Sequence, residues 1–195
     1  VDMGRVYDFH RRQLQLLQWH CPPDRWVLKS SSHLWSMDAL LDRYPDACIV
    51  QTHRDPLKVL ASFTSLVATL RQFYSGRVDV KQIGEQQAAF LSSGLNRAME
   101  FRRSGRVPAS QVLDIQFDDF IQDPVGCIAG IYEYFGRTLS APAAQAMRTF
   151  LAANPGDKHG KHAYRFSDTG LDAAVERQRF AEYGEHFGIP VEPAT

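Results

Sequence analysis

Apolar positions recur at two different spacings along the chain, and these spacings predict alternating helices and strands. Helical spacing marks residues 5–20, 35–44, 56–75, 80–104, 123–135, 141–153 and 171–187. Short, unbroken apolar or β-branched runs predict strands at 25–29, 47–52 and 111–117, a turn follows at 118–124, and polar residues 154–170 predict a loop. This alternation is typical of an α/β domain whose parallel sheet carries helices on both faces.

The helix that follows the second predicted strand has a readable start. Asp55 is a candidate N-cap and Pro56 fits the first helical position. The first helix is predicted to be amphipathic, with Val6, Phe9, Leu14 and Leu17 at helical spacing, and this one carries a helical stripe of Val59, Phe63, Val67 and Leu70.

Composition narrows the class of protein without naming a partner. The 195 residues are predicted to form a single domain, 1–195. The chain carries 22 Lys and Arg against 22 Asp and Glu, and because this balance leaves no excess of positive charge, no nucleic-acid partner is expected. No apolar run reaches the roughly 20 residues that span a bilayer. The three cysteines form no CxxC pair, which favours a reducing, cytoplasmic setting.

The tripeptide His53-Arg54-Asp55 also opens the catalytic loop of protein kinases, but the rest of a kinase is missing. A kinase needs an Asn five residues after the Asp, where this chain has Leu60, and neither Asp-Phe-Gly nor a glycine-rich phosphate loop occurs. A strand, a turn with Arg54 and a helix N-terminus remain, and this combination favours anions. Ser62 lies about two turns along the helix. Arg54 and Ser62 are therefore predicted to grip one phosphate; alternatively, Arg54 pairs with a carboxylate and Ser62 bonds to its own helix.

Arg54, a proline two residues later and a serine eight residues later resemble the 3′-phosphate-binding segment of sulfotransferases. The block "RWVLKSSSHLWSMDALLDRYPDACIVQTHRDPLKVLASFTSLV" resembles the centre of the bacterial branch of that family. "VLDIQFDDFIQDPVGCIAGIYEYFG" and the segment from Asn154 to Pro190 are similar to later blocks, in the same order. The resemblance implies a P-loop-NTPase-like sulfotransferase fold with a three-layer parallel sheet. It also implies sulfuryl transfer from 3′-phosphoadenosine-5′-phosphosulfate (PAPS) to a small-molecule hydroxyl or amine, in a scheme that requires no metal.

The resemblance also assigns roles to residues. Arg54 and Ser62 would bind the 3′-phosphate of PAPS, and Lys29 would lie near the transferring group. Ser31 stands where cytosolic members have their base, so His33 is the candidate general base, with capping or packing as its alternative. His53 is a weaker rival that instead could orient the phosphate site.

Two further segments resemble donor-binding parts of the family. Phe117 stands where a Tyr near the adenine is common, and its ring can stack on a base or simply belong to the core. The residues that would close over the 3′-phosphate are Lys158, Gly160, Lys161 and His162. His159 and His162 without a third ligand are weak evidence for a metal.

The family's N-terminal phosphosulfate-binding loop has no counterpart before residue 25. The chain is therefore expected to correspond to the C-terminal two-thirds of a sulfotransferase, incomplete at the N-terminus. The alternative function is a truncated, non-catalytic domain that binds adenosine bisphosphate or a protein partner. Phe73, Tyr74 and Phe90 are expected either to line an acceptor pocket or to pack helices on the sheet, and a homodimer is a possible assembly.

Overall fold

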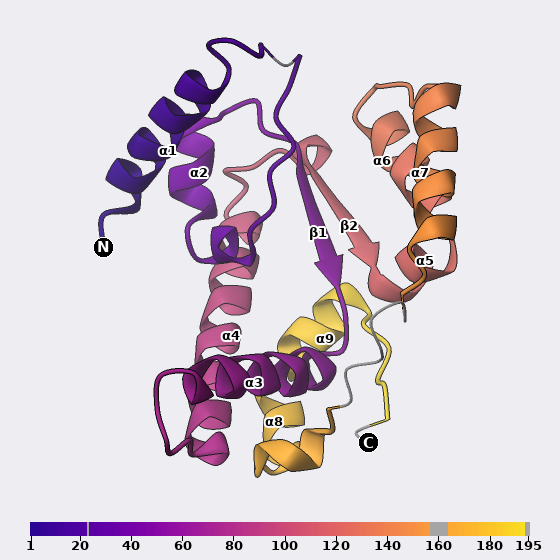
Figure 1. Ribbon diagram of the computed structural model, residues 1–195. Coiled ribbons are helices and arrows are strands. Elements are labelled where there is room, and N and C mark those ends of the chain that lie inside the picture. Colours follow the sequence, from indigo (N-terminus) through magenta and orange to yellow (C-terminus); the bar gives the residue numbers. More distant parts are fainter. Residues whose placement is uncertain (23, 157–163, 194–195) are drawn as a thin grey trace.

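The computed structural model describes residues 1–22, 24–156 and 164–193, and a pair of parallel strands lies at its centre (Figure 1). β1 (Ile49–His53) runs beside β2 (Val112–Gln116), with Ile49 opposite Val112 and His53 opposite Gln116. Helices lie on both sides of the pair, with α1, α2 and α4 on one and α6 and α7 on the other (Figure 1). The predicted α/β class with a parallel sheet is confirmed.

The helices follow the predicted order closely. They are α1 (Met3–Leu17), α2 (Met37–Arg43), α3 (Pro56–Gln72), α4 (Val80–Arg103), α5 (Phe117–Gln122), α6 (Pro124–Tyr134), α7 (Ala141–Ala153), α8 (Ala173–Arg179) and α9 (Ala181–Phe187). Short 3₁₀ turns are η1 (Ser31–Trp35), η2 (Ala109–Gln111) and η3 (Phe166–Thr169). The predicted turn at 118–124 is mostly helix α5, and the predicted last helix is two helices that meet at the buried Phe180.

An Asp-Pro pair marks the N-terminus of both α3 and α6. The Asp55 carboxylate accepts a hydrogen bond from the backbone N–H of Leu57 at 2.9 Å, and Pro56 is the first helical residue of α3, as predicted. Asp123 and Pro124 repeat this arrangement at the start of α6. An aspartate that accepts from the first turn therefore sets where these helices begin.

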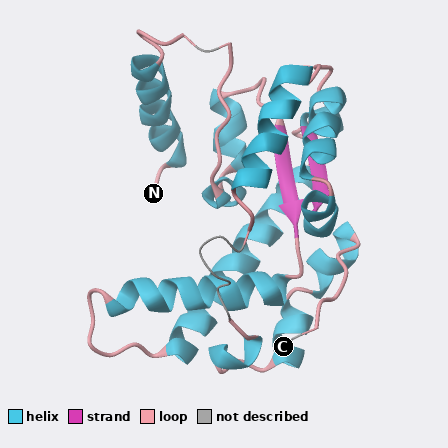
Figure 2. Cartoon of the chain, turned by 45° about the vertical axis from the view of Figure 1, so that its right-hand side comes forward, coloured by secondary structure: helices cyan, strands magenta, loops and turns pink. Residues whose placement is uncertain are grey.

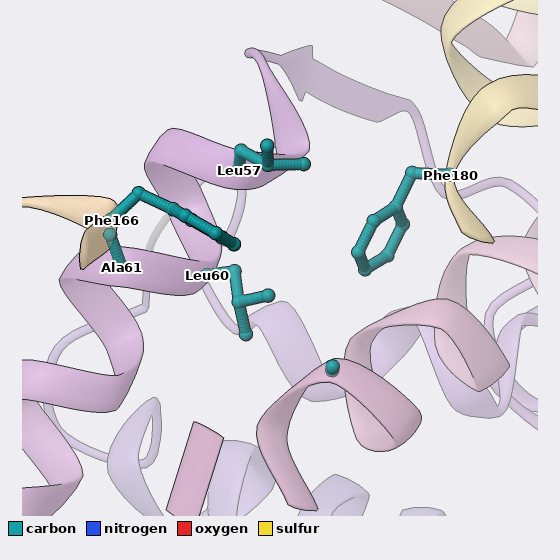
Figure 3. Packing of buried hydrophobic residues seen from close by; sticks show 6 residues of the cluster. Leu57, Leu60, Ala61, Phe166 and Phe180 are labelled. Atoms are coloured by element: carbon teal, nitrogen blue, oxygen red, sulfur yellow. The ribbon is translucent and has the colours of Figure 1, made fainter. Parts of the chain in front are cut away.

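The hydrophobic core lies where α3 meets α4 and the C-terminal segments (Figure 3). Its buried members are Leu57, Leu60, Ala61, Ala88, Phe166 and Phe180. The buried face of α3 carries Leu57, Leu60, Ala61, Thr64 and Ala68, which differs from the apolar stripe that the sequence marks. Val59 and Leu70 are 37% and 50% exposed. Both faces of α3 are apolar, and the face with small alanines is the one that lets another helix approach closely.

The first helix forms, but most of its predicted face is exposed. Among the predicted residues, Leu14 is buried, whereas Phe9 and Leu17 are 62% and 63% exposed. The other buried residue of α1 is Tyr7.

The strand predicted at 25–29 is wrong: residues 25–30 have no regular secondary structure and form part of the loop between α1 and η1 (Figure 2). Val27 is 87% exposed. A strand needs a hydrogen-bonded neighbour, and within the described ranges β1 pairs only with β2. An apolar run alone does not supply that neighbour.

Two glycines in the middle of helices should respond in opposite ways to alanine. A methyl group at Gly94 of α4 would collide with the indole of Trp35, which also stacks on Phe90 with ring centroids 4.1 Å apart. Gly94→Ala is expected to cost about 1–3 kcal/mol, the usual range for overpacking. Gly130→Ala in α6 meets nothing within 4 Å and should stabilise by about 0.5–1 kcal/mol. Urea unfolding midpoints measure both, and a harmless Gly94→Ala would contradict the packing of Trp35 on α4.

Candidate functional site

Arg54 lies between the carboxyl end of β1 and the N-terminus of α3. In a parallel α/β sheet, ligands bind outside the carboxyl ends of the strands. The free N–H groups of a helix N-terminus add a partial positive charge to such a place. Arg54 therefore has the position that the phosphate hypothesis requires.

The Arg54 guanidinium already holds an anion supplied by the chain itself. Its Nε and Nη2 donate to Oε1 and Oε2 of Glu192 at 2.8 and 3.0 Å. The hydrogen bonds that Arg54 donates to Glu192 are the main reason that the pKa of Arg54 is raised above its ordinary value. The alternative in which Arg54 pairs with a carboxylate is thus what the structure contains, and Glu192 was missed because it lies 138 residues away.

Phe117, the first residue of α5, covers the same guanidinium. The Arg54 carbon Cζ lies 4.3 Å from the centre of the Phe117 ring, a cation–π distance. Two of the residues assigned to donor binding are therefore in contact. The ring face toward Arg54 is occupied, so a stacked base would need the other face or the ring edge.

Asp55 fixes the C-terminal segment to the start of α3. Arg177 donates to both Asp55 oxygens, at 2.5 and 2.7 Å, and the backbone N–H of Glu192 donates to Oδ2 at 2.7 Å. Burial would by itself raise the pKa of the Asp55 carboxyl, but the hydrogen bonds from Arg177, Leu57 and Glu192 outweigh burial and lower that pKa. The residues Arg54, Asp55, Phe117, Arg177 and Glu192 are called the Arg54 cluster below.

His53, at the end of β1, is buried and its two ring nitrogens have partners. Nε2 lies 2.8 Å from Oδ1 of Asp114 and Nδ1 lies 2.7 Å from the hydroxyl of Tyr183. Because a carboxylate only accepts, Nε2 donates. The ring also stacks on Phe187, with centroids 4.1 Å apart. These contacts fix the position of the buried His53 ring at the end of β1, next to Arg54.

Arg102 of α4 completes this network by donating to both oxygens of Asp114, at 2.7 and 2.6 Å. Burial would raise the pKa of Asp114, but the hydrogen bonds from His53 and Arg102 lower it strongly. Burial is also the main cause of the strongly raised pKa of Tyr183. An aspartate inside the apolar run "VLDIQF" was the available sign of this network.

His33 lies in η1, where its Nδ1 is 2.8 Å from the hydroxyl of Tyr7. Burial, followed by the charge of His10, lowers the pKa of His33 below its ordinary value. Lys29 is exposed on the irregular segment before η1. In the described part of the chain, no hydrogen bond or ion pair joins either residue to the Arg54 cluster.

The remaining predicted donor-binding residues are placed only in part. Ser62 is half-buried in α3, and its hydroxyl forms no hydrogen bond with the residues that the structure describes. Lys158, Gly160, Lys161 and His162 lie outside the described residues.

Within the described ranges, no group of three or more His, Cys, Asp or Glu side chains could hold a metal ion. In the same ranges, no helix is long and apolar enough to cross a membrane.

The residues expected to line an acceptor pocket are exposed in the turn after α3 and on α4. Phe73 and Tyr74 are 76% and 92% exposed, and Phe90 is 45% exposed. Tyr74 lines a groove of about 360 Å³ between the end of α3 and the start of α4. One face of the Phe90 ring is covered, because it stacks on the indole of Trp35.

Comparison with known proteins identifies relatives. The family described as "Sulfotransferase family" matches residues 5–141. The structure resembles the crystal structure of sulfotransferase STF9 from Mycobacterium avium, with a TM-score of 0.88 and 29% identity over 98% of this chain and 49% of that one. It also resembles sulfotransferase STF1 from Mycobacterium tuberculosis H37Rv, with a TM-score of 0.78 and 37% identity over 93% of this chain and 46% of that one. The chain thus spans about half the length of these relatives. No curated protein sequence matches.

Proposed function

The chain belongs to the sulfotransferase family, and from that premise we propose that it transfers a sulfuryl group from PAPS to the hydroxyl or amine of a small acceptor. The observation that carries this proposal is the position of Arg54 at the carboxyl end of β1 and the start of α3, where it already binds an oxyanion in a bidentate grip. A phosphate monoester offers the same planar pair of oxygens to a guanidinium. The resemblance to sulfotransferases inferred from the sequence agrees with the family and structural matches.

In the proposed reaction, the acceptor oxygen or nitrogen attacks the sulfur of PAPS. The bond between sulfur and the bridging oxygen breaks, and adenosine 3′,5′-bisphosphate leaves with the negative charge. Lys29 would stabilise that charge, and His33 would take the proton of the acceptor. Arg54 and Ser62 would hold the 3′-phosphate, Phe117 would lie near the adenine, and Lys158, Gly160, Lys161 and His162 would cover the donor.

The three thiols support a reducing setting for this reaction. Cys21, Cys48 and Cys127 are all free in the structure. Free thiols persist where glutathione and thioredoxin keep them reduced. We therefore place the proposed activity in the cytoplasm.

The direct test is transfer of ³⁵S from labelled PAPS to a panel of phenols, alcohols, lipids and glycosides. Labelled product that needs both donor and acceptor is the expected result, and the acceptors that react define the substrate class. Label that stays on the donor with every acceptor, while the protein binds adenosine 3′,5′-bisphosphate, would oppose catalysis.

His33 sets an expected pH dependence for this turnover. A general base must be neutral to accept a proton, and the lowered pKa of His33 keeps it neutral to lower pH. The turnover rate should therefore stay constant from pH 8 down to below about 6.5, the ordinary pKa of histidine, before it falls. The His33→Gln variant should be slower and lack this acid limb. An unchanged profile in His33→Gln would remove His33 as the base.

A further inference from the structure

The carboxylate of Glu192 occupies the edge of Arg54 that offers two parallel donors. Both Glu192 oxygens are bound, one by Nε and one by Nη2, and the two side chains are only 23% and 30% exposed. A bidentate phosphate contact would use the same pair of parallel donors. The two anions therefore compete for this edge of Arg54.

The backbone of Glu192 is held by groups other than Arg54. Its N–H donates to Asp55, and its carbonyl oxygen accepts from Nη2 of Arg177 at 3.0 Å. Arg177 is in turn fixed by its two bonds to Asp55. Rotation of the Glu192 side chain can therefore release Arg54 while the C-terminal segment stays in place.

Charge makes the two occupants exclude one another. The Glu192 carboxylate neutralises Arg54, and a phosphate brought to the same place would meet that carboxylate as a second anion at short range. Because Glu192 is tethered, its effective concentration at Arg54 is high. An incoming anion has to displace the Glu192 carboxylate, and the free energy needed for this displacement lowers the affinity for that anion.

We propose that Glu192 is a built-in competitor for the 3′-phosphate: it covers Arg54 when the site is empty and returns to Arg54 as adenosine 3′,5′-bisphosphate leaves. This inference rests on the proposed function, in which Arg54 binds that phosphate. The contact weakens binding of the product and so favours its release. It also gives the ligand-free protein a neutral site that unrelated anions bind poorly.

The test compares Glu192→Gln with Glu185→Gln by isothermal titration of adenosine 3′,5′-bisphosphate. Glu185 is exposed on α9 and has no ion pair in the described chain, so this control removes the same charge elsewhere. Glu192→Gln should bind about 1.5-fold to fivefold more tightly than the wild type, the range for a partly exposed ion pair. Glu185→Gln should match the wild type. Adenosine 5′-monophosphate, which lacks the 3′-phosphate, should bind to Glu192→Gln and to the wild type with the same affinity.

Equal or weaker binding by Glu192→Gln would overturn the inference, since a Glu192 that only positions Arg54 would predict a loss. Arg54→Ala, titrated in parallel, separates a failure of the phosphate site from a failure of the competitor role of Glu192. If Arg54→Ala binds poorly and Glu192→Gln matches its control, the phosphate site stands and the competitor is wrong. If Arg54→Ala binds as the wild type does, the phosphate site itself is wrong.

A second measurement needs no ligand. Phenylglyoxal modifies accessible guanidinium groups, and peptide mass spectrometry reports the rate at Arg54 separately from the other arginines. The rate at Arg54 should rise in Glu192→Gln and stay unchanged in Glu185→Gln. An unchanged rate in both variants would overturn the inference whatever the nucleotide affinity.

Discussion

Arg54→Ala is expected to weaken the binding of adenosine 3′,5′-bisphosphate about 10- to 150-fold. A hydrogen bond to a charged group contributes about 1.5–3 kcal/mol, and every 1.4 kcal/mol is tenfold in affinity. The variant also leaves the Glu192 carboxylate beside the place where the phosphate would bind, which adds repulsion. Isothermal titration measures the dissociation constant, and the melting temperature shows that the variant is folded.

Two variants make this result specific. Arg71→Ala removes an arginine from the last turn of the same helix, where its side chain donates to Gln86 at 2.9 Å, and should leave the dissociation constant unchanged. Arg54→Lys keeps the charge but loses the planar pair of donors, so its affinity should lie between those of Ala and Arg. If Arg54→Ala and Arg71→Ala bind alike, Arg54 is no phosphate ligand.

Features that depend on neighbouring residues could be predicted from the sequence. The start of α3 at Asp55 and Pro56 is an example, because the cap and the fixed proline backbone act within four residues. The order of β1, α3, α4 and β2 follows for the same reason, since their spacings are local properties.

Features that depend on distant partners could not be predicted in this way. The apolar run 25–29 resembles a strand, but strand formation depends on a neighbour that the run itself does not specify. α3 has apolar residues on both faces, and only the packing against α4 selects Leu60 and Ala61 over Val59 and Leu70.

The candidate site shows the same division. Arg54 was found from its position after a strand and before a helix, whereas Glu192 is bound through a contact that no spacing predicts. From the sequence, His53 is a candidate base because histidines often serve as bases. Its burial between Asp114 and Tyr183 is a tertiary property that no spacing in the sequence predicts.

The second large effect concerns stability and belongs to Asp55. Its side chain is fully buried and carries two bonds from Arg177 and one from the backbone N–H of Glu192. Removing one partner of a buried ion pair costs about 3–5 kcal/mol, and Asp55→Asn should fall near the lower end, because the Arg177 side chain is 29% exposed and can be partly hydrated. Asp79→Asn is the matched control, since Asp79 caps α4 by accepting from the backbone N–H of Gln82, and asparagine caps about as well.

The effect of pH separates the ion pair from the cap. The folded-state pKa of Asp55 is lowered, so its contribution is complete above the unfolded value of about 4 and is lost as the pH falls through the folded value. Urea midpoints should therefore show a constant gap between wild type and Asp55→Asn from about pH 8 to 5, and a shrinking gap toward about pH 3. A gap as large at about pH 3 as at neutral pH, or an Asp55→Asn variant as stable as Asp79→Asn, would mean that Asp55 acts only as a helix cap. The C-terminal segment would then need another anchor to hold Glu192 at Arg54.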